Sequence, residues 1–173
     1  KELIRTKSSI EKLYNKKINI KNLIFSSNIE DAVSNADLIQ ENVPERLNLK
    51  KKVIYQLSKF APKNSIIASS SSGLLPSALQ SNCINPKRFV IAHPFNPVYI
   101  LPLVEIVKGN KTSKIVMNEA DKFYKNLHMK TLIVNKELPG FLSDRLQEAL
   151  WREGLHIINE GYATTKDLDE AIT

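Results

Sequence analysis

Short apolar runs alternate with amphipathic helical patterns along this chain as far as residue 134. The apolar runs predict short strands at 23–25, 37–43, 65–68, 88–92, 101–105 and 131–134. The segments between them predict helices at 1–16, 27–36, 49–60, 76–80 and 113–127. Strands that alternate with helices in this way are typical of a layered α/β domain whose sheet is largely parallel.

The alternation stops at Pro139 and Gly140, two residue types that interrupt regular structure. Residues 141–160 then predict one long helix, and residues 164–167 predict the start of another. We expect the apolar side chains of the long helix to be buried, namely Leu142, Leu146, Leu150, Leu155 and Ile158. The chain is therefore predicted to divide into an α/β domain at 1–136 and the start of an all-helical domain at 137–173.

Composition narrows the class of protein. At 173 residues and 42% hydrophobic content, the chain fits one domain, or one domain and part of another. No apolar stretch approaches the roughly 20 residues that a membrane span needs, and no secretion signal opens the chain. The single cysteine, Cys83, excludes an internal disulfide and suits a reducing compartment, so we expect a cytoplasmic protein with no membrane partner.

The net charge of +7 raises the question of a nucleic-acid partner. However, the lysines are spread along the chain, and aromatic residues do not alternate with them as they do in single-strand-binding surfaces. We therefore expect a solvated basic surface and no nucleic-acid partner. Such a surface can also help to attract an anionic cofactor or substrate.

Polar side chains follow three of the predicted strands. They lie at 41–45, at 69–72 and at 93–96. In open α/β sheets, ligands bind beyond the carboxyl ends of the strands. One polar strand end means little, because loops are polar in any case. Three in succession predict a single crevice that serves as an active site.

One of these polar clusters contains His93, and Glu105 follows it by twelve residues. A histidine acts as a general base near neutral pH when a neighbouring group fixes its tautomer and supports the imidazolium that it becomes. The chain is apolar at 89–91, turns through two prolines after the histidine, and is apolar again up to the glutamate. Such a turn can place a histidine at the end of one strand beside a glutamate in the next. The alternative is a surface His-Pro turn and an unrelated edge-strand glutamate, and the spacing alone does not choose between them.

Four motifs, in this order, resemble the 3-hydroxyacyl-CoA dehydrogenase superfamily. They are Asn-Val-Pro-Glu at 42–45, Ala and four serines at 68–72, His-Pro-Phe-Asn-Pro at 93–97 with Glu105, and the segment from Pro-Gly-Phe to Arg at 139–145. Within the superfamily, the segments 93–105, 144–153 and 159–165 look most like the carnitine dehydrogenases. The resemblance implies an incomplete Rossmann-type dinucleotide-binding domain followed by the start of a helical C-terminal domain.

The resemblance also implies roles for individual residues. His93 would be the base that takes the substrate hydroxyl proton, and Glu105 would hold and support it. Ser72 would hydrogen-bond the reacting oxygen, and Asn96 would lie near the nicotinamide and the substrate, so both residues would belong to the cofactor site and to the substrate site. Glu45 and Lys50 would contact the dinucleotide. Each has an alternative, since Glu45 and Lys50 are also plausible as ordinary helix charges, and Ser72 as a helix N-cap.

Carnitine is a 3-hydroxy acid that carries a quaternary ammonium, which aromatic faces and carboxylates can bind. Three residues of the long helix share one face at spacings of four and three: Asp144, Glu148 and Trp151. We hypothesise that this face, with Phe95 or Tyr99, contacts the trimethylammonium group. The alternative is an ordinary Glu148–Arg152 pair, with Trp151 packed in an interface.

The expected function is hydride transfer from L-carnitine to NAD, which gives 3-dehydrocarnitine. The alternatives are a 3-hydroxyacyl-CoA dehydrogenase and a catalytically silent protein on the same scaffold, as in crystallin relatives. The resemblance further implies a homodimer, and we expect no metal ion in the site.

All five glycines lie at Gly73 or later, so the glycine-rich turn that cradles the pyrophosphate is not in this sequence. We therefore expect a fragment that lacks this N-terminal segment and most of the C-terminal domain, and the preference for NAD over NADP rests on the resemblance.

We predict that the 173-residue chain alone binds NAD poorly, because it lacks the backbone amides that would hold the pyrophosphate. Adding the N-terminal segment should restore binding, which isothermal titration calorimetry can measure. Tight NAD binding by the 173-residue chain would contradict this prediction.

Overall fold

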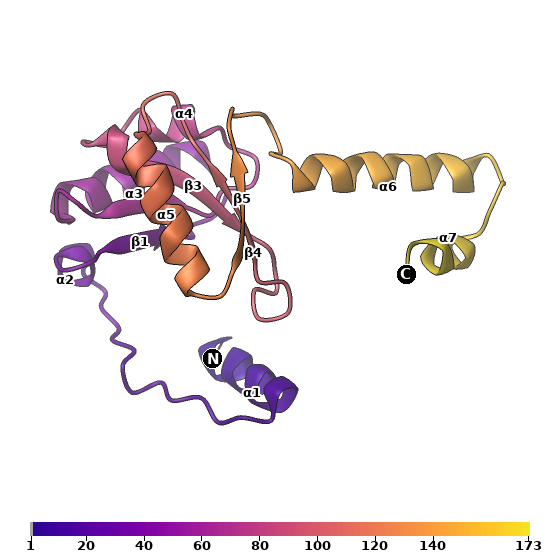
Figure 1. The fold of residues 1–173 in the computed structure, drawn as a ribbon, viewed down its shortest axis with the longest axis horizontal. Helices are drawn as coiled ribbons and strands as arrows, with labels where there is room; N and C mark the ends of the chain where they lie inside the picture. The colour runs from indigo at the N-terminus through magenta and orange to yellow at the C-terminus, as the bar shows by residue number, and fades with distance from the viewer. Residues whose placement is uncertain (1) are drawn as a thin grey trace.

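The computed structural model describes residues 2–173, which form a five-stranded sheet with helices on both faces (Figure 1). The strands lie in chain order: β1 (Leu38–Glu41), β2 (Ile66–Ser69), β3 (Phe89–Pro94), β4 (Leu103–Val107) and β5 (Lys130–Val134). β1, β2 and β3 are parallel, β4 is antiparallel to β3, and β5 is parallel to β4. The predicted Rossmann-like α/β fold with a largely parallel sheet is confirmed.

The helices begin close to the positions that the sequence predicts. They are α1 (Glu2–Tyr14), α2 (Ile29–Val33), α3 (Leu47–Phe60), α4 (Pro76–Gln80), α5 (Lys114–Asn126), α6 (Ser143–Asn159) and α7 (Thr165–Ile172), with a 3₁₀ turn at Pro86–Arg88. Asn28 and Ser113 accept hydrogen bonds from backbone amides in the first turns of α2 and α5, and Thr164 forms a capping box with Asp167 in α7. These caps satisfy amides that otherwise have no partner within the helix.

The core lies on both faces of the sheet. On one face α3 and α4 cover β2 and β3, and Ile54 and Leu79 are completely buried there. On the other face α5 packs on β3, β4 and β5, with Val116 and Ala120 buried against the strands. β2 and the first four residues of β3 are buried on both sides, as expected for a strand in the middle of an α/β sheet.

Two predictions about apolar segments are wrong. The run at 23–25 does not form a strand, and Ile24 and Phe25 are 93% and 78% exposed. A strand requires a neighbour to satisfy its amides and carbonyls, and within residues 2–173 no strand pairs with this run.

The second error concerns the apolar face of α6. This helix extends away from the sheet, and its far half lies near α7 alone (Figure 1). Leu146 is therefore 72% exposed and Leu150 is 54% exposed, although their spacing is that of a buried helix face. Hydrophobic periodicity identifies the face that needs a partner, but it does not supply the partner.

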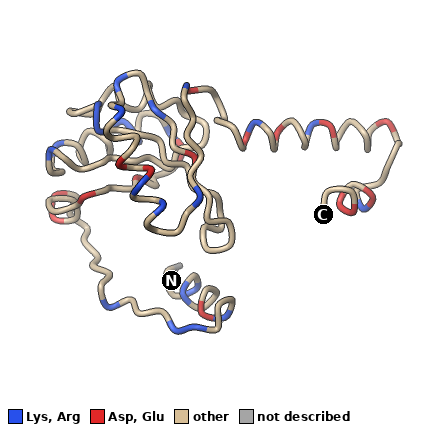
Figure 2. The backbone as a smooth tube through the Cα atoms, in the orientation of Figure 1, with Lys and Arg blue, Asp and Glu red and all other residues tan. Residues whose placement is uncertain are grey.

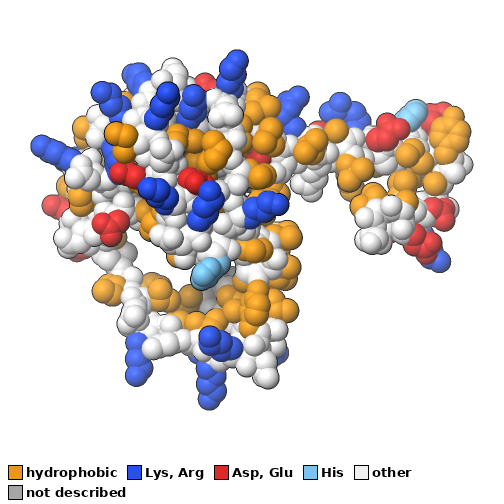
Figure 3. All heavy atoms as spheres, viewed as in Figure 1, with side chains coloured by type: hydrophobic (Ala, Val, Ile, Leu, Met, Phe, Trp, Pro, Cys, Tyr) orange, Lys and Arg blue, Asp and Glu red, His pale blue; other side chains and the backbone are white. Residues whose placement is uncertain are grey.

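Charged residues are distributed along the whole chain, with acidic residues between the basic ones (Figure 2). Lysine and arginine side chains are spread over the visible face and do not form a single stripe (Figure 3). Among the helices of residues 2–173, none is long and apolar enough to cross a bilayer.

Candidate active site

The register of the sheet brings the predicted polar strand ends to one edge. The carboxyl ends of β1, β2 and β3 meet there, and β4 starts at the same edge because it runs in the opposite direction. Glu41 pairs with Ser69 across β1 and β2, and His93 pairs with Glu105 across β3 and β4. Since side chains alternate between faces, all four lie on the face that α3 and α4 cover.

The structure brings His93 and Glu105 into direct contact. The ring Nδ1 of His93 lies 3.0 Å from Oε2 of Glu105. The carboxylate side chain is completely buried, whereas the histidine side chain is 12% exposed. The antiparallel pairing of β3 and β4 causes this contact, because residues directly opposite one another in such a pair have neighbouring side chains.

The second oxygen of Glu105 binds the start of α6. Oε1 accepts hydrogen bonds from the backbone amides of Leu142 at 2.9 Å and Ser143 at 3.0 Å. Gly140 and Phe141 precede these amides with φ angles of +73° and +46°, and this left-handed turn directs them at the carboxylate. Burial raises the pKa of Glu105, but the hydrogen bonds from His93, Ser143 and Leu142 outweigh it and hold the pKa below its usual value.

Two aromatic rings flank the histidine. The centroids of Phe95 and Phe141 lie 5.6 Å and 5.8 Å from that of His93, and Phe141 is completely buried. The ionised Glu105 selects the tautomer in which Nδ1 carries the proton. The other nitrogen, Nε2, then has its lone pair free to accept a proton.

The four serines at 69–72, of which Ser69 is the last residue of β2, differ in their hydrogen-bond partners. The first three donate hydrogen bonds to the end of β1 or the segment just beyond it: Ser69 to Glu41 at 2.6 Å, Ser70 to Asn42 at 2.6 Å, and Ser71 to Glu45. Within the part of the chain that the structure describes, the hydroxyl of Ser72 has no partner, and this residue is half-buried. It is not a helix N-cap, because α4 has Leu75 at that position.

Lys50 is not a surface charge. It is only 1% exposed, and its Nζ lies 3.0 Å from Oε1 of Glu41 and 3.4 Å from Oε2 of Glu45. Glu45 is more exposed, but its Oε1 accepts hydrogen bonds from Ser71 and from the backbone amides of Gly73 and Leu74. Burial raises the pKa of Glu45, and these hydrogen bonds together with Lys50 bring it below its usual value. Contact of Glu45 and Lys50 with a dinucleotide stays a prediction.

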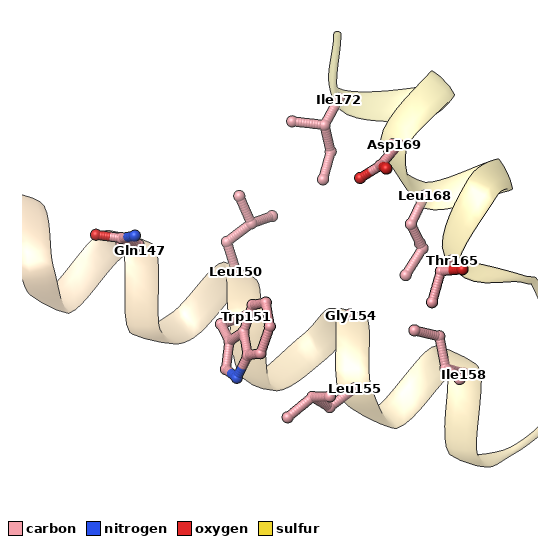
Figure 4. Close-up of a pocket in the computed structure, with 10 residues that line it drawn as sticks. All are labelled: Gln147, Leu150, Trp151, Gly154, Leu155, Ile158, Thr165, Leu168, Asp169 and Ile172. Atoms are coloured by element: carbon pink, nitrogen blue, oxygen red, sulfur yellow. The ribbon is translucent and has the colours of Figure 1, made fainter. Parts of the chain in front are cut away.

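Three predicted residues remain: Asn96, Asp144 and Trp151. Asn96 is exposed just beyond β3, and Asp144 is half-buried beside Ser143 at the start of α6. Trp151 lies eight residues after Ser143, about 12 Å along the helix axis, and is 66% exposed. It lines a groove of about 360 Å³ between α6 and α7, whose other apolar walls include Leu155 and Leu168 (Figure 4). The structure does not bring Trp151 to His93 in this chain, and the alternative Glu148–Arg152 pair is present at 3.4 Å.

Residues 2–138 match the family model described as "3-hydroxyacyl-CoA dehydrogenase, NAD binding domain". The chain belongs to this family. Two L-carnitine dehydrogenases match it closely: one from Oceanobacillus iheyensis is 54% identical over 87% of the chain and 49% of its own length, and one from Pseudomonas putida is 53% identical over 87% and 47%. The chain therefore spans about half the length of the curated relatives it matches.

Solved structures of two dehydrogenases have a similar fold. A (S)-3-hydroxybutyryl-CoA dehydrogenase from Ralstonia eutropha superposes with a TM-score of 0.86 at 26% identity, over 95% of this chain and 60% of its own. An NAD⁺-dependent 5-formyl-3-hydroxy-2-methylpyridine 4-carboxylic acid 5-dehydrogenase superposes with a TM-score of 0.87 at 28% identity, over 99% and 56%.

Sequence reasoning missed two groups at this candidate site. The first is Glu41, which it grouped with the polar strand end without a role, although the structure buries it at the centre of the Lys50 and Ser69 contacts. The second is the pair of backbone amides at Leu142 and Ser143. An acidic residue in an apolar strand was a signal for the first, whereas no side-chain pattern marks the second.

The lowered pKa of Glu105 predicts a pH dependence of stability. A carboxyl group whose pKa is lower in the folded state stabilises the fold above its unfolded pKa, and this contribution is lost as the pH falls through the folded pKa. We expect Glu105→Gln to be less stable than wild type at neutral pH, and the difference to shrink once the pH falls below about 4.5, the usual value for glutamate.

Urea unfolding at a series of pH values measures this difference. The matched control is Glu170→Gln, because Glu170 is exposed and its ion pair, with Lys166 across one turn of α7, is a surface contact at 3.6 Å. The prediction would be contradicted if the free energies of unfolding of Glu105→Gln and wild type still differed by the same amount at pH values well below 4.5.

Proposed function

We propose that the protein containing this chain is an NAD-dependent dehydrogenase of 3-hydroxy acids, with L-carnitine as its substrate. The observation that carries the proposal is the His93–Glu105 contact at the edge where β1, β2 and β3 end. The L-carnitine dehydrogenases at 54% and 53% identity support the choice of substrate. We extend the proposal to a homodimer, for which the exposed leucines of α6 provide an apolar surface.

In this mechanism, His93 removes the proton of the substrate hydroxyl group. Its Nδ1–H stays hydrogen-bonded to Glu105, so Nε2 takes the proton and Glu105 stabilises the imidazolium that forms. The backbone amides of Leu142 and Ser143 keep the carboxylate oriented toward the ring throughout. Ser72, whose hydroxyl has no partner among residues 2–173, donates a hydrogen bond to the reacting oxygen.

NAD supplies the acceptor for the hydride that leaves the substrate carbon. The residues of this chain fit the nicotinamide end of such a cofactor, because Ser72 and the exposed Asn96 lie just beyond the carboxyl ends of β2 and β3. Glu45 and Lys50 complete the proposed contacts. The segment that would bind the pyrophosphate has no counterpart in the first 72 residues, which contain no glycine.

For the trimethylammonium group of L-carnitine, Asp144 and Phe95 are better placed than Trp151. Asp144 follows Ser143, whose amide contacts Glu105, and the ring of Phe95 lies beside His93. A carboxylate and an aromatic face together suit a quaternary ammonium. A 3-hydroxyacyl-CoA substrate is the second candidate, because the family model is described as a 3-hydroxyacyl-CoA dehydrogenase and the Ralstonia eutropha enzyme is a (S)-3-hydroxybutyryl-CoA dehydrogenase.

A kinetic experiment on the complete protein compares the two substrates and tests His93 as the base. We expect a higher kcat/KM for L-carnitine than for 3-hydroxybutyryl-CoA, and we expect His93→Gln to lower kcat by about 10²- to 10⁴-fold, the usual contribution of a general base. Formation of NADH at 340 nm measures both.

The matched control is His156→Gln, because His156 lies in the last turn of α6 with its side chain exposed. Its kcat should remain that of wild type. A higher kcat/KM for the thioester would favour the second candidate, and full activity of His93→Gln would contradict the proposed base.

A separate prediction concerns recognition of the ammonium group. We expect Asp144→Asn to raise the KM for L-carnitine roughly tenfold, the equivalent of about 1.4 kcal/mol. Trp151→Ala should leave KM within about twofold, because this residue lies about 12 Å along α6 from the amides that bind Glu105. Steady-state kinetics of both variants with saturating NAD gives the two KM values. The assignment fails if KM responds to Trp151→Ala and not to Asp144→Asn.

A further inference from the structure

We propose that Glu41 is a positioning residue, which fixes the hydroxyl of Ser72 by holding the backbone on both sides of it. The inference rests on the proposed function, because it concerns the hydroxyl that binds the reacting oxygen. Glu41 itself is only 3% exposed and faces the protein interior, so it acts through its neighbours and makes no contact with substrate.

The contacts of Glu41 link three segments of the chain. Its Oε1 accepts hydrogen bonds from the backbone amide of Val43 and from Lys50 at 3.0 Å. Its Oε2 accepts hydrogen bonds from Ser69 at 2.6 Å and from Lys50 at 3.2 Å. One buried carboxylate therefore joins the end of β1, the first part of α3 and the end of β2.

Two routes lead from Glu41 to Ser72. The direct route is the hydrogen bond from Ser69, three residues before Ser72. The indirect route passes through Lys50, which also contacts Glu45 at 3.4 Å. Glu45 then accepts hydrogen bonds from residues on both sides of Ser72. The donors are the hydroxyl of Ser71 and the backbone amides of Gly73 at 3.1 Å and Leu74 at 3.2 Å.

As a result, hydrogen bonds hold the residues on either side of Ser72, while its own hydroxyl has no partner among residues 2–173. Such an arrangement positions a donor in advance for a substrate oxygen. The charge balance makes it sensitive to Glu41, because Lys50 is buried and depends on two carboxylates. Removing one partner of a buried ion pair disturbs the remaining charge and hence the groups that it holds.

A purely structural role for Glu41 makes different kinetic predictions. If Glu41 only stabilises the fold, its substitution lowers the amount of folded enzyme and acts independently of Ser72. If Glu41 positions Ser72, its effect on kcat disappears once the hydroxyl of Ser72 has been removed. A double-mutant cycle separates the two cases.

The experiment uses the complete protein with L-carnitine and NAD, and compares Glu41→Gln, Ser72→Ala and the double variant. We expect Glu41→Gln to lower kcat about tenfold while KM for L-carnitine changes less than about twofold, as for a small misplacement of a group that acts in the transition state. The double variant should have the kcat of Ser72→Ala. Multiplicative effects of the two substitutions would overturn the inference.

Hydrogen exchange of the peptide covering 69–75, measured without cofactor or substrate, provides a readout that does not depend on activity. We expect faster exchange in Glu41→Gln and unchanged exchange in the control variant Glu119→Gln. Glu119 lies in α5 and pairs at 2.7 Å with Arg88, which immediately precedes β3 and so lies at the end of that strand opposite to His93. Unchanged exchange in Glu41→Gln would overturn the inference.

If Glu41→Gln does not fold, Ser69→Ala replaces it in the double-mutant cycle. This substitution removes the hydrogen bond from Ser69 to Glu41 and leaves the ion pair between Glu41 and Lys50 intact. Its kcat effect should likewise vanish in the Ser72→Ala background. Wild-type enzyme that is inactive on L-carnitine would contradict the proposed function, whereas the exchange measurement would still decide the role of Glu41.

Discussion

The buried carboxylate of Glu105 is the constraint on which the rest of the site depends. An ionised carboxylate removed from water is strongly unfavourable unless hydrogen-bond donors replace the water. Here three donors do so: the ring of His93 on one oxygen, and the amides of Leu142 and Ser143 on the other. The antiparallel pairing of β3 and β4 supplies the first donor, and the left-handed turn before α6 supplies the other two. The orientation of the histidine is therefore set jointly by the sheet and by the start of a helix.

The same solution occurs a second time on the same face of the sheet. Glu41 is buried at the end of β1, and Lys50, Ser69 and the amide of Val43 satisfy its oxygens. Below these two acids the strands carry only apolar side chains toward α3 and α4, so the polar groups are confined to the strand ends. Because the polar groups are confined to the strand ends, the domain keeps an apolar core and still places charged side chains at one edge of the sheet.

Periodicity in the sequence was sufficient to predict the strands of the sheet and the starts of most helices, because each depends on a few neighbouring residues. The His93–Glu105 contact was a plausible prediction for the same reason, since a short two-proline connection separates the two strands. Other features depend on partners far away in the chain. Lys50 resembles a surface lysine of an amphipathic helix until the fold places two carboxylates beside it. The amides that hold Glu105 come from a turn in which Phe141, a bulky residue, adopts a positive φ angle.

The position of α6 has a consequence for the dyad. The amides at its start bind Oε1 of Glu105, while Oε2 binds His93, so both sets of hydrogen bonds share one carboxylate. A rotation of that carboxylate toward the helix lengthens its contact with the ring, and loss of the amides removes donors that keep it ionised. The rest of α6 contributes little to holding this arrangement, because its apolar face is exposed beyond the first turn. The Gly140–Phe141 turn and the packing of Phe141 against the histidine ring must therefore fix the start of the helix, and through it the geometry of the base.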